Sequence, residues 1–196
     1  MYLIIMSLKK FISITVIVSL THILIHTIQI QLYSGNFFSE QLNTIAYSIY
    51  MPHGTRILFF LIYGFWSIPG MFLSHIITAF NNDGFISFDY ILIIAILIAI
   101  FCVPVAGLFL RNFFQDIYKN QNFFSPSYII SLTLLSAFIN ASLTNILRLF
   151  TIFNYDKDRF ITEFFGYFFG DILGVIVIVF MFLILKRIFI ISVEKV

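Results

Sequence analysis

The stretch Tyr90–Leu110, YILIIAILIAIFCVPVAGLFL, carries no charged side chain over its whole length. The hydrocarbon core of a bilayer is about 30 Å thick, and a helix needs about 20 mostly apolar residues to cross it. This stretch therefore predicts a transmembrane helix. Pro104 inside it predicts a kink, whose freed carbonyl neighbouring helices must satisfy. Cys102, the only cysteine, is expected to be a small packing residue.

The composition of the whole chain extends this prediction beyond one segment. Of 196 residues, 61% are hydrophobic and only 10% are charged. Soluble domains are nearer half apolar and a quarter charged, so lipid is expected to solvate most of this surface. The length indicates a single integral membrane domain over residues 1–196, with no room for a soluble catalytic domain.

Five further apolar blocks predict an all-α polytopic transmembrane helix bundle of about six spans. The blocks are Phe11–Leu32, Arg56–Ile68, Pro69–Phe80, Tyr128–Phe150 and Phe164–Leu185. The first is too long for the apolar core of a signal peptide and no cleavage site follows it, so it is interpreted as a membrane helix. The second and third blocks are short, which leaves open a broken or re-entrant segment near residues 41–56.

The distribution of basic residues predicts the orientation of the chain in the membrane. With six spans both termini share a side, and that side carries Lys9, Lys10, Arg111, Lys119, Lys186, Arg187 and Lys195. The other side carries Arg56, Arg148, Lys157 and Arg159. The chain is therefore expected to be a multi-pass protein of the cell membrane, with both termini in the cytoplasm.

Polar side chains in the first block recur with helical spacing. They are Thr15, Ser19, His22, His26 and Gln29, which share one helix face. This face is expected to look into the bundle. Its interpretation stays open between a ligand or metal site using His22 and His26 and interhelical hydrogen bonds that hold the bundle together; no further ligand completes a zinc or di-iron set, and no metal is assigned.

A second polar face lies on the block Tyr128–Phe150. It consists of Ser136, Asn140, Thr144 and Arg148, with Asn145 beside it. Arg148 either extends its charge to the interface at the helix end or neutralises an anion or a carboxylate such as Asp171.

The last block begins with a glycine groove. Gly166, Gly170 and Gly174 form a doubled G-x-x-x-G pattern, which predicts close approach of another helix. Asp171 lies on the shoulder of this groove, and a carboxylate at membrane depth needs a partner. Arg148, Arg56 or a histidine are the candidates.

The segment Pro52–Arg56, PHGTR, has two interpretations. One is a helix N-terminus whose free N–H groups, with His53 and Arg56, bind an anionic group. The other is an ordinary helix start. Phosphate-binding glycine loops, zinc-protease and serine-hydrolase motifs are all absent from the sequence, as is a basic stripe for nucleic acid.

Three segments together resemble the MASE1 family of bacterial membrane-associated sensor domains. They are Pro52–Arg56, then Gly64–Gly70 (GFWSIPG), and Gly170–Val177 (GDILGVIV). The resemblance implies a sensory domain. His53 departs from the small residue expected there, and with the sequence ending at Val196 any output is expected to pass through a separate protein.

The sequence thus supports three hypotheses, none of them enzymatic and none with an assigned cofactor. The first is a sensory or ligand-binding membrane domain that acts with a protein partner in the membrane or cytoplasm. The others are a substrate-capture subunit or small transporter, and an accessory subunit of a membrane complex. The candidate ligand-binding residues are His53, Arg56, Asp171, Arg148, His22, His26 and Asn140.

Overall fold

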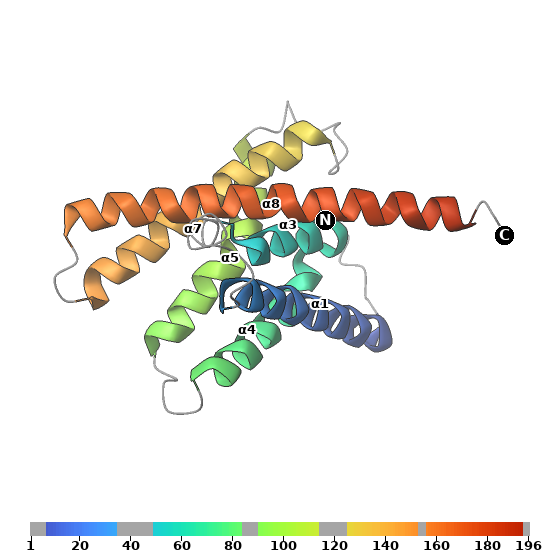
Figure 1. The fold of residues 1–196 in the computed structure, drawn as a ribbon, viewed down its shortest axis with the longest axis horizontal. Coiled ribbons are helices and arrows are strands. Elements are labelled where there is room, and N and C mark those ends of the chain that lie inside the picture. The colour runs from blue at the N-terminus through green and yellow to red at the C-terminus, as the bar shows by residue number, and fades with distance from the viewer. Residues whose placement is uncertain (1–6, 35–48, 84–89, 114–124, 153–155, 194–196) are drawn as a thin grey trace.

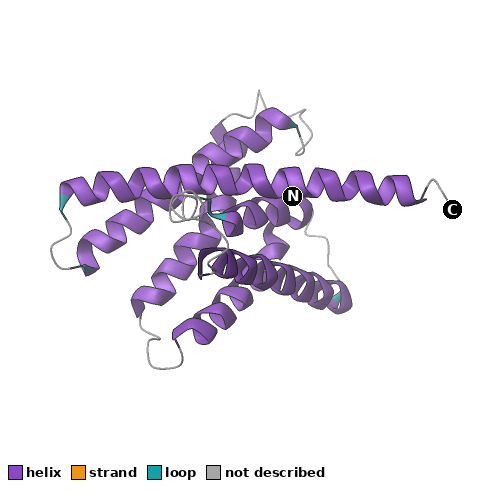
Figure 2. Ribbon diagram, viewed as in Figure 1, coloured by secondary structure: helices purple, strands orange, loops and turns teal. Residues whose placement is uncertain are grey.

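The computed structural model describes residues 7–34, 49–83, 90–113, 125–152 and 156–193, and within them every regular element is helical. Figures 1 and 2 show these helices packed as a bundle. The elements are α1 (Leu8–Ser34), α3 (Met51–Tyr63), the 3₁₀ turn η1 (Gly64–Ser67), α4 (Ile68–Asp83), α5 (Tyr90–Phe113), α7 (Pro126–Thr151) and α8 (Lys157–Val193). The predicted all-α class is therefore confirmed.

Five helical segments in the described chain are long and apolar enough to cross a membrane. They are Leu8–Leu32, Met51–Phe80, Tyr90–Phe113, Pro126–Thr151 and Lys157–Leu185. Helices α1, α5, α7 and α8 each supply one such segment, and they contain the apolar blocks expected from the sequence. The proline in α5 does not end that helix, which runs through Pro104. The expectation of a bundle of helices that are long and apolar enough to cross a membrane is therefore confirmed.

The segment Met51–Phe80 differs from the two separate blocks expected there. Its break lies at Gly64–Ser67 and not at Pro69–Gly70, which belong to the first turn of α4. Gly64 ends α3 with φ 59° and ψ −138°, a backbone conformation that is essentially confined to glycine. The helix therefore stops at Gly64 because the backbone there leaves the helical conformation.

The chain reverses direction at η1. At one end of α3, Met51 N donates to Gln29 of α1, and beyond its other end Trp66 packs edge-on against Phe11, so α3 runs antiparallel to α1. Helix α4 runs parallel to α1, because Ser19 contacts the Gly70 carbonyl and His22 contacts Ser74. Thus α3 and α4 form a bend, called the α3–α4 hairpin below, whose two arms pack on α1 more than on each other. The chain can be followed through this bend in Figure 1.

Contacts along the other helices show their directions relative to α3. Tyr50 N donates to the Gly170 carbonyl and Gly54 lies against Gly174, so α3 is parallel to α8. Arg56 reaches the Ala99 carbonyl and Phe60 lies over Gly107, so α3 is also parallel to α5. Helix α7 is antiparallel to α8, as shown by a hydrogen bond from Asn140 to Asp171 and an ion pair between Arg148 and Glu163.

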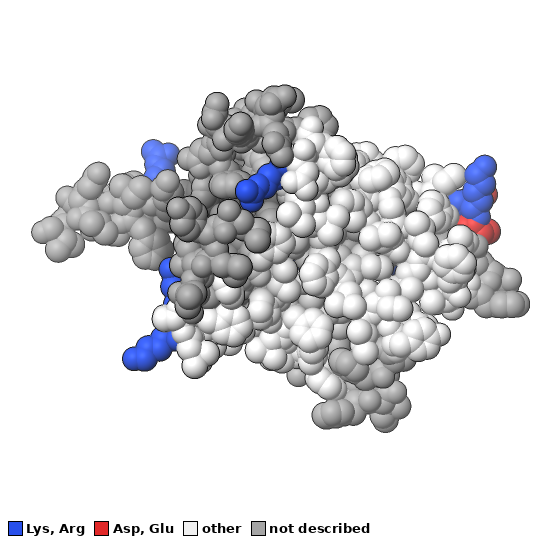
Figure 3. Space-filling model, turned by 180° about the vertical axis from the view of Figure 1, so that it is seen from behind, with Lys and Arg blue, Asp and Glu red and all other residues white. Residues whose placement is uncertain are grey.

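The surface of the bundle is what a lipid-solvated protein requires. Large apolar side chains are exposed on every long helix, including Leu20, Leu24, Ile130, Phe180 and Leu183. In water such surface is a liability, whereas in a bilayer it is the expected solvent contact. Figure 3 shows charged side chains towards the two ends of the molecule, with an uncharged band between them.

Candidate functional site

Helix α3 is only 13 residues long but is the most buried element of the bundle. Its residues Met51 to Ile57 are all buried. At 1.5 Å per residue it is roughly 20 Å long, less than the hydrocarbon core. It begins beside Gly170 and Gly174, which are near the middle of the segment Lys157–Leu185 of α8. The start of α3 therefore lies at the mid-depth of the bundle.

The N-terminus of α3 does not present free N–H groups. Tyr50 N donates to the Gly170 carbonyl at 2.9 Å, and Met51 N donates to Gln29 Oε1 at 2.9 Å. Pro52 has no N–H, and His53 N bonds the Tyr50 carbonyl. An anion site made of these N–H groups, one of the two sequence interpretations, is therefore absent from this helix start, because α1 and α8 already satisfy them.

Two glycines allow α3 and α8 to touch backbone to backbone. A Cβ on Gly174 would lie 2.0 Å from the Tyr50 carbonyl oxygen, and one on Gly54 would lie 2.5 Å from the Gly174 carbonyl oxygen. Gly170 contributes its carbonyl to Tyr50 N. Nothing lies within 4 Å of a Cβ built on Gly166, so this glycine of the predicted groove takes no part in the close approach.

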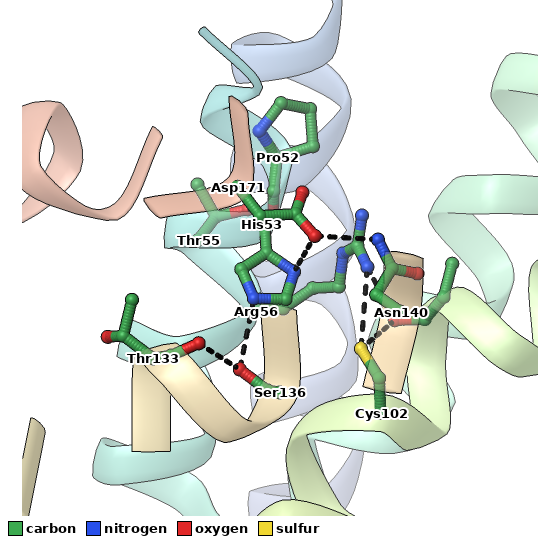
Figure 4. A network of polar contacts seen from close by, with 10 residues as sticks. Pro52, His53, Thr55, Arg56, Cys102, Thr133, Ser136, Asn140 and Asp171 are labelled. Carbon is green, nitrogen blue, oxygen red and sulfur yellow. Dashed lines mark hydrogen bonds and ion pairs between the residues drawn. The ribbon is translucent and has the colours of Figure 1, made fainter. Parts of the chain in front are cut away.

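This approach brings His53 of α3 against the carboxylate of Asp171, and both side chains are fully buried (Figure 4). His53 Nδ1 lies 3.5 Å from Asp171 Oδ2, and Asn140 Nδ2 of α7 donates to the same oxygen at 2.7 Å. The other ring nitrogen, His53 Nε2, lies 3.0 Å from Ser136 Oγ. A chain of polar contacts therefore joins α3, α7 and α8.

Arg56, one turn further along α3, occupies the other half of the site. Its side chain is 1% exposed. Nη1 donates to the Ala99 carbonyl at 2.6 Å and lies 3.8 Å from Cys102 Sγ, while the guanidinium stands over the Tyr50 ring at 5.3 Å. The ion pairs found in the described chain do not include Arg56. A carbonyl dipole, a thiol and an aromatic face contact this charge, and the nearby Asp171 carboxylate attracts it from beyond ion-pair distance.

Three polar atoms of this site lack a hydrogen-bond partner. They are Arg56 Nε, Asp171 Oδ1 and His53 Nδ1. Figure 4 shows these side chains converging on one small region, with Asn140 beside them. A buried group left unsatisfied carries a desolvation penalty of about 1–3 kcal/mol, and more when it is charged. Cys102, Asn140 and Asp171 are each near the middle of their segments, so the penalty falls at mid-depth.

His22 and His26 lie elsewhere, between α1 and α4. The His22 ring is 4.8 Å from the His75 ring, and Ser74 Oγ lies 3.1 Å from His22 Nδ1. Ser19 and Gln29 of the same face bond Gly70 and Met51. Ser19, His22 and Gln29 thus make interhelical hydrogen bonds, whereas His22 Nε2, His26 Nδ1 and His75 Nε2 are buried without a hydrogen-bond partner. In the described part of the chain no cluster of three or more His, Cys, Asp or Glu residues could hold a metal ion.

Arg148 is not a partner of Asp171. It forms an ion pair with Glu163 of α8, and its guanidinium stands 5.1 Å from the centre of the Tyr167 ring. Glu163 also pairs with Arg159, one turn away. These groups lie towards the end of the α7–α8 pair, where part of each side chain is exposed.

The site also contains groups that were not among the candidate ligand-binding residues predicted from the sequence. Tyr50, Cys102, Ser136 and the Ala99 carbonyl all contact candidate residues. Ser136 is visible in sequence as a member of a polar face, and Tyr50 as a neighbour of the PHGTR segment. No sequence signal marks the Ala99 carbonyl, because any residue carries one.

Comparison with known proteins returned no match to a family model, a curated protein or a solved structure.

Proposed function

We propose that this chain is a membrane-embedded ligand-binding domain of the sensory, MASE1-like type, and that it acts through a separate protein partner. The observation that carries the proposal is the buried guanidinium of Arg56, which in the described chain has no carboxylate within ion-pair distance although Asp171 lies in the same site. A charge at mid-depth is expensive and marks a functional site by default. A bound ligand would meet the unsatisfied Arg56 Nε and Asp171 Oδ1.

The chemistry of the two halves defines the ligand class. Arg56 supplies a fixed positive charge and an unused N–H donor, which suit a carboxylate or another small anion. Asp171 supplies an unused acceptor, which suits a hydroxyl, amine or protonated group. The proposed ligand is therefore a small polar molecule that carries an anionic group and a hydrogen-bond donor. It requires no covalent step, and the proposed role is not enzymatic.

Helix α8 is the proposed output element. It holds α3 through Gly170 and Gly174, and it runs for 37 residues, roughly 55 Å, well beyond the thickness of the hydrocarbon core. A ligand that draws Arg56 and Asp171 together shifts α3 against α8. Because the contact is backbone to backbone, a small shift there moves the whole of α8, whose far end would meet the partner.

The charge distribution supports cytoplasmic termini in the cell membrane. Helices α1 and α8 are antiparallel, so the end of the bundle where α1 starts is the end where α8 finishes. That end carries Lys9, Lys10, Arg111 and Arg187. The opposite end mixes Arg148, Lys157 and Arg159 with Asp156, Asp158 and Glu163. An excess of basic residues favours the cytoplasmic side. The proposed topology counts α3 and α4 as separate passes, which makes six with the other four long helices; the described chain has five segments long and apolar enough to cross, with Met51–Phe80 as one of them.

A small transporter or substrate-capture subunit is the second candidate. It is favoured by α3, which begins at mid-depth as a discontinuous helix, a feature that transporters use to build a substrate site. The accessory-subunit hypothesis has no specific contact in its favour.

Co-purification in gentle detergent, with mass spectrometry of bound proteins and small molecules, tests the proposal. We expect the wild-type chain to retain a polar anionic molecule and a stoichiometric partner. Arg56→Gln and Asp171→Asn should each lose the small molecule at least tenfold, whereas Arg148→Gln should retain it, because Arg148 lies outside the site. Equal retention by all four proteins would refute the site.

Uptake by proteoliposomes separates the two candidates. The molecule identified by co-purification is supplied outside vesicles that contain the chain and its partner. Binding without accumulation supports the sensory role. Accumulation that is lost in Arg56→Gln and preserved in Arg148→Gln would replace it with the transport role.

A further inference from the structure

A pocket separate from the Arg56 site opens between α3, η1, α5 and α7. Its volume is about 300 Å³, and its walls include Phe60, Gly64, Phe65, Leu108, Tyr128 and Arg111. This volume is at the lower end of the range for small-molecule sites. The walls are almost wholly apolar, and the one charged side chain among them is Arg111.

Two glycines shape this pocket. Gly107 has no Cβ, so the Phe60 ring lies against the α5 backbone, 2.7 Å from where that Cβ would be. Gly64 turns the chain at φ 59° and has open space around its missing Cβ. Both glycines therefore border the pocket, one at the turn that ends α3 and one on the face of α5 opposite Phe60.

The position of the pocket indicates which kind of molecule can enter it. Leu108 and Phe65 are both exposed, 43% and 50%, so the pocket opens on the lipid-facing surface. Arg111 is in the last turn of α5, at the end of the bundle that also carries Lys9, Lys10 and Arg187. A molecule entering here has an apolar part at the depth of Phe60 and Phe65 and meets a positive charge at the end of α5. An anionic phospholipid has this arrangement of groups.

We infer that this pocket is a specific site for an anionic phospholipid, with its acyl chain along Phe60, Phe65 and Leu108 and its phosphate paired with Arg111. The site is independent of the Arg56 site and of the ligand proposed there. An acyl chain would wedge between η1 and α5, so its occupancy would brace the α3–α4 hairpin against the rest of the bundle.

Photo-crosslinking in nanodiscs tests this inference. The probes are phosphatidylglycerol and phosphatidylcholine that carry the same diazirine acyl chain, each at low fraction in phosphatidylcholine discs, with peptide mapping of the labelled sites. We expect phosphatidylglycerol to label Phe65 and Leu108 about fivefold more than phosphatidylcholine, the factor expected from one basic side chain near an anionic headgroup. Arg111→Gln should remove this preference.

Two further variants separate a specific site from general lipid contact. Arg187→Gln removes a basic residue at the same end of the bundle but outside the pocket, and it should leave the preference intact. Leu108→Trp fills the pocket and should reduce labelling of Phe65 by both lipids, while labelling of the exposed Phe180 on α8 stays constant. Equal labelling by the two lipids in the wild type, or a preference that survives Arg111→Gln, would overturn the inference.

Discussion

Arg56 and Asp171 lie in one buried site without forming an ion pair, and this has a measurable consequence. Burying two charges that do not pair directly with each other opposes folding, because each loses hydration that its neighbours replace only in part. The proposed function explains this cost by the ligand that the two groups bind. If the site is a binding site, its charged groups destabilise the empty protein, and their replacement should show it.

The double variant Arg56→Met with Asp171→Asn tests this at the level of side chains. It removes both buried charges together and leaves neither one uncompensated, so we expect the free energy of unfolding to stay constant or to rise by on the order of 1 kcal/mol. Ligand retention should be lost at the same time. The measurement is the thermal unfolding midpoint in one detergent, with Arg148→Met, at a half-buried position outside the site, as the comparison. A clear loss of stability in the double variant would instead assign the two groups to the structural framework.

At the level of elements, the contact between α3 and α8 depends on Gly54 of α3 and Gly174 of α8. Gly174 lies against the backbone of Tyr50, which cannot rotate away as a side chain can. Gly166, two turns earlier on α8, faces open space. The two positions therefore form a matched pair within one helix and one sequence pattern.

Gly174→Ala should lower the free energy of unfolding by about 1–3 kcal/mol, because the helices must separate to admit the methyl group. Gly166→Ala should have no such effect and can stabilise α8 by about 0.5–1 kcal/mol through helix propensity. Thermal midpoints of both variants, measured side by side, check the prediction. Similar losses at both positions would mean that α8 packs along the whole glycine pattern.

The reversal between α3 and α4 depends on a different property of glycine. A Cβ on Gly64 would meet no atom within 4 Å, but the backbone there has φ 59°. Gly64→Ala should therefore lower stability by about 1–3 kcal/mol from backbone strain alone. Gly166→Ala is again the control, since both sites have space and only Gly64 has the unusual conformation. A neutral Gly64→Ala would show that α3 and α4 can continue as one straight helix.

At the scale of the whole molecule, the hairpin decides which face of the membrane each later helix end reaches. If α3 and α4 cross separately, Ser7 and Asn112 lie on one face and Thr151 on the other. If Met51–Phe80 crosses once as a straight helix, Asn112 moves to the face opposite Ser7. The single native cysteine, Cys102, is buried and should not react with a thiol reagent. Any labelling would therefore come from a cysteine introduced at one of these exposed positions.

A membrane-impermeant maleimide, applied to inside-out and right-side-out vesicles, measures this arrangement. We expect Ser7→Cys and Asn112→Cys to react only in inside-out vesicles and Thr151→Cys only in right-side-out vesicles. The unsubstituted protein is the control and should not react. Reaction of Ser7→Cys and Asn112→Cys from opposite faces would contradict the hairpin.

Much of the architecture was predictable because hydropathy is a local property. The uncharged run Tyr90–Leu110 lies within α5, and Tyr128–Phe150 lies within α7, because any apolar segment of that length must satisfy its own backbone in a helix. The polar face of α1 could also be predicted from spacing, since the period of a helix does not depend on its neighbours.

The pairing of polar groups could not be predicted in the same way. Asp171 had several candidate partners in sequence, and its contacts are His53 and Asn140, while Arg148 pairs with Glu163. Such pairs depend on the depth and rotation of each helix in the bundle. Those quantities follow from packing, including the backbone contact at Gly54 and Gly174, which no single segment encodes.

The sequence by itself thus determined a lipid-solvated helical protein, its long apolar helices and which of their faces are polar. Only the tertiary structure decided that the chain doubles back at Gly64, that the start of α3 is buried at mid-depth, and that Arg56 and Asp171 share a site without a direct ion pair. The physical reason is that helix formation in a bilayer is set within each segment, whereas helix direction and side-chain pairing are set by contacts between segments.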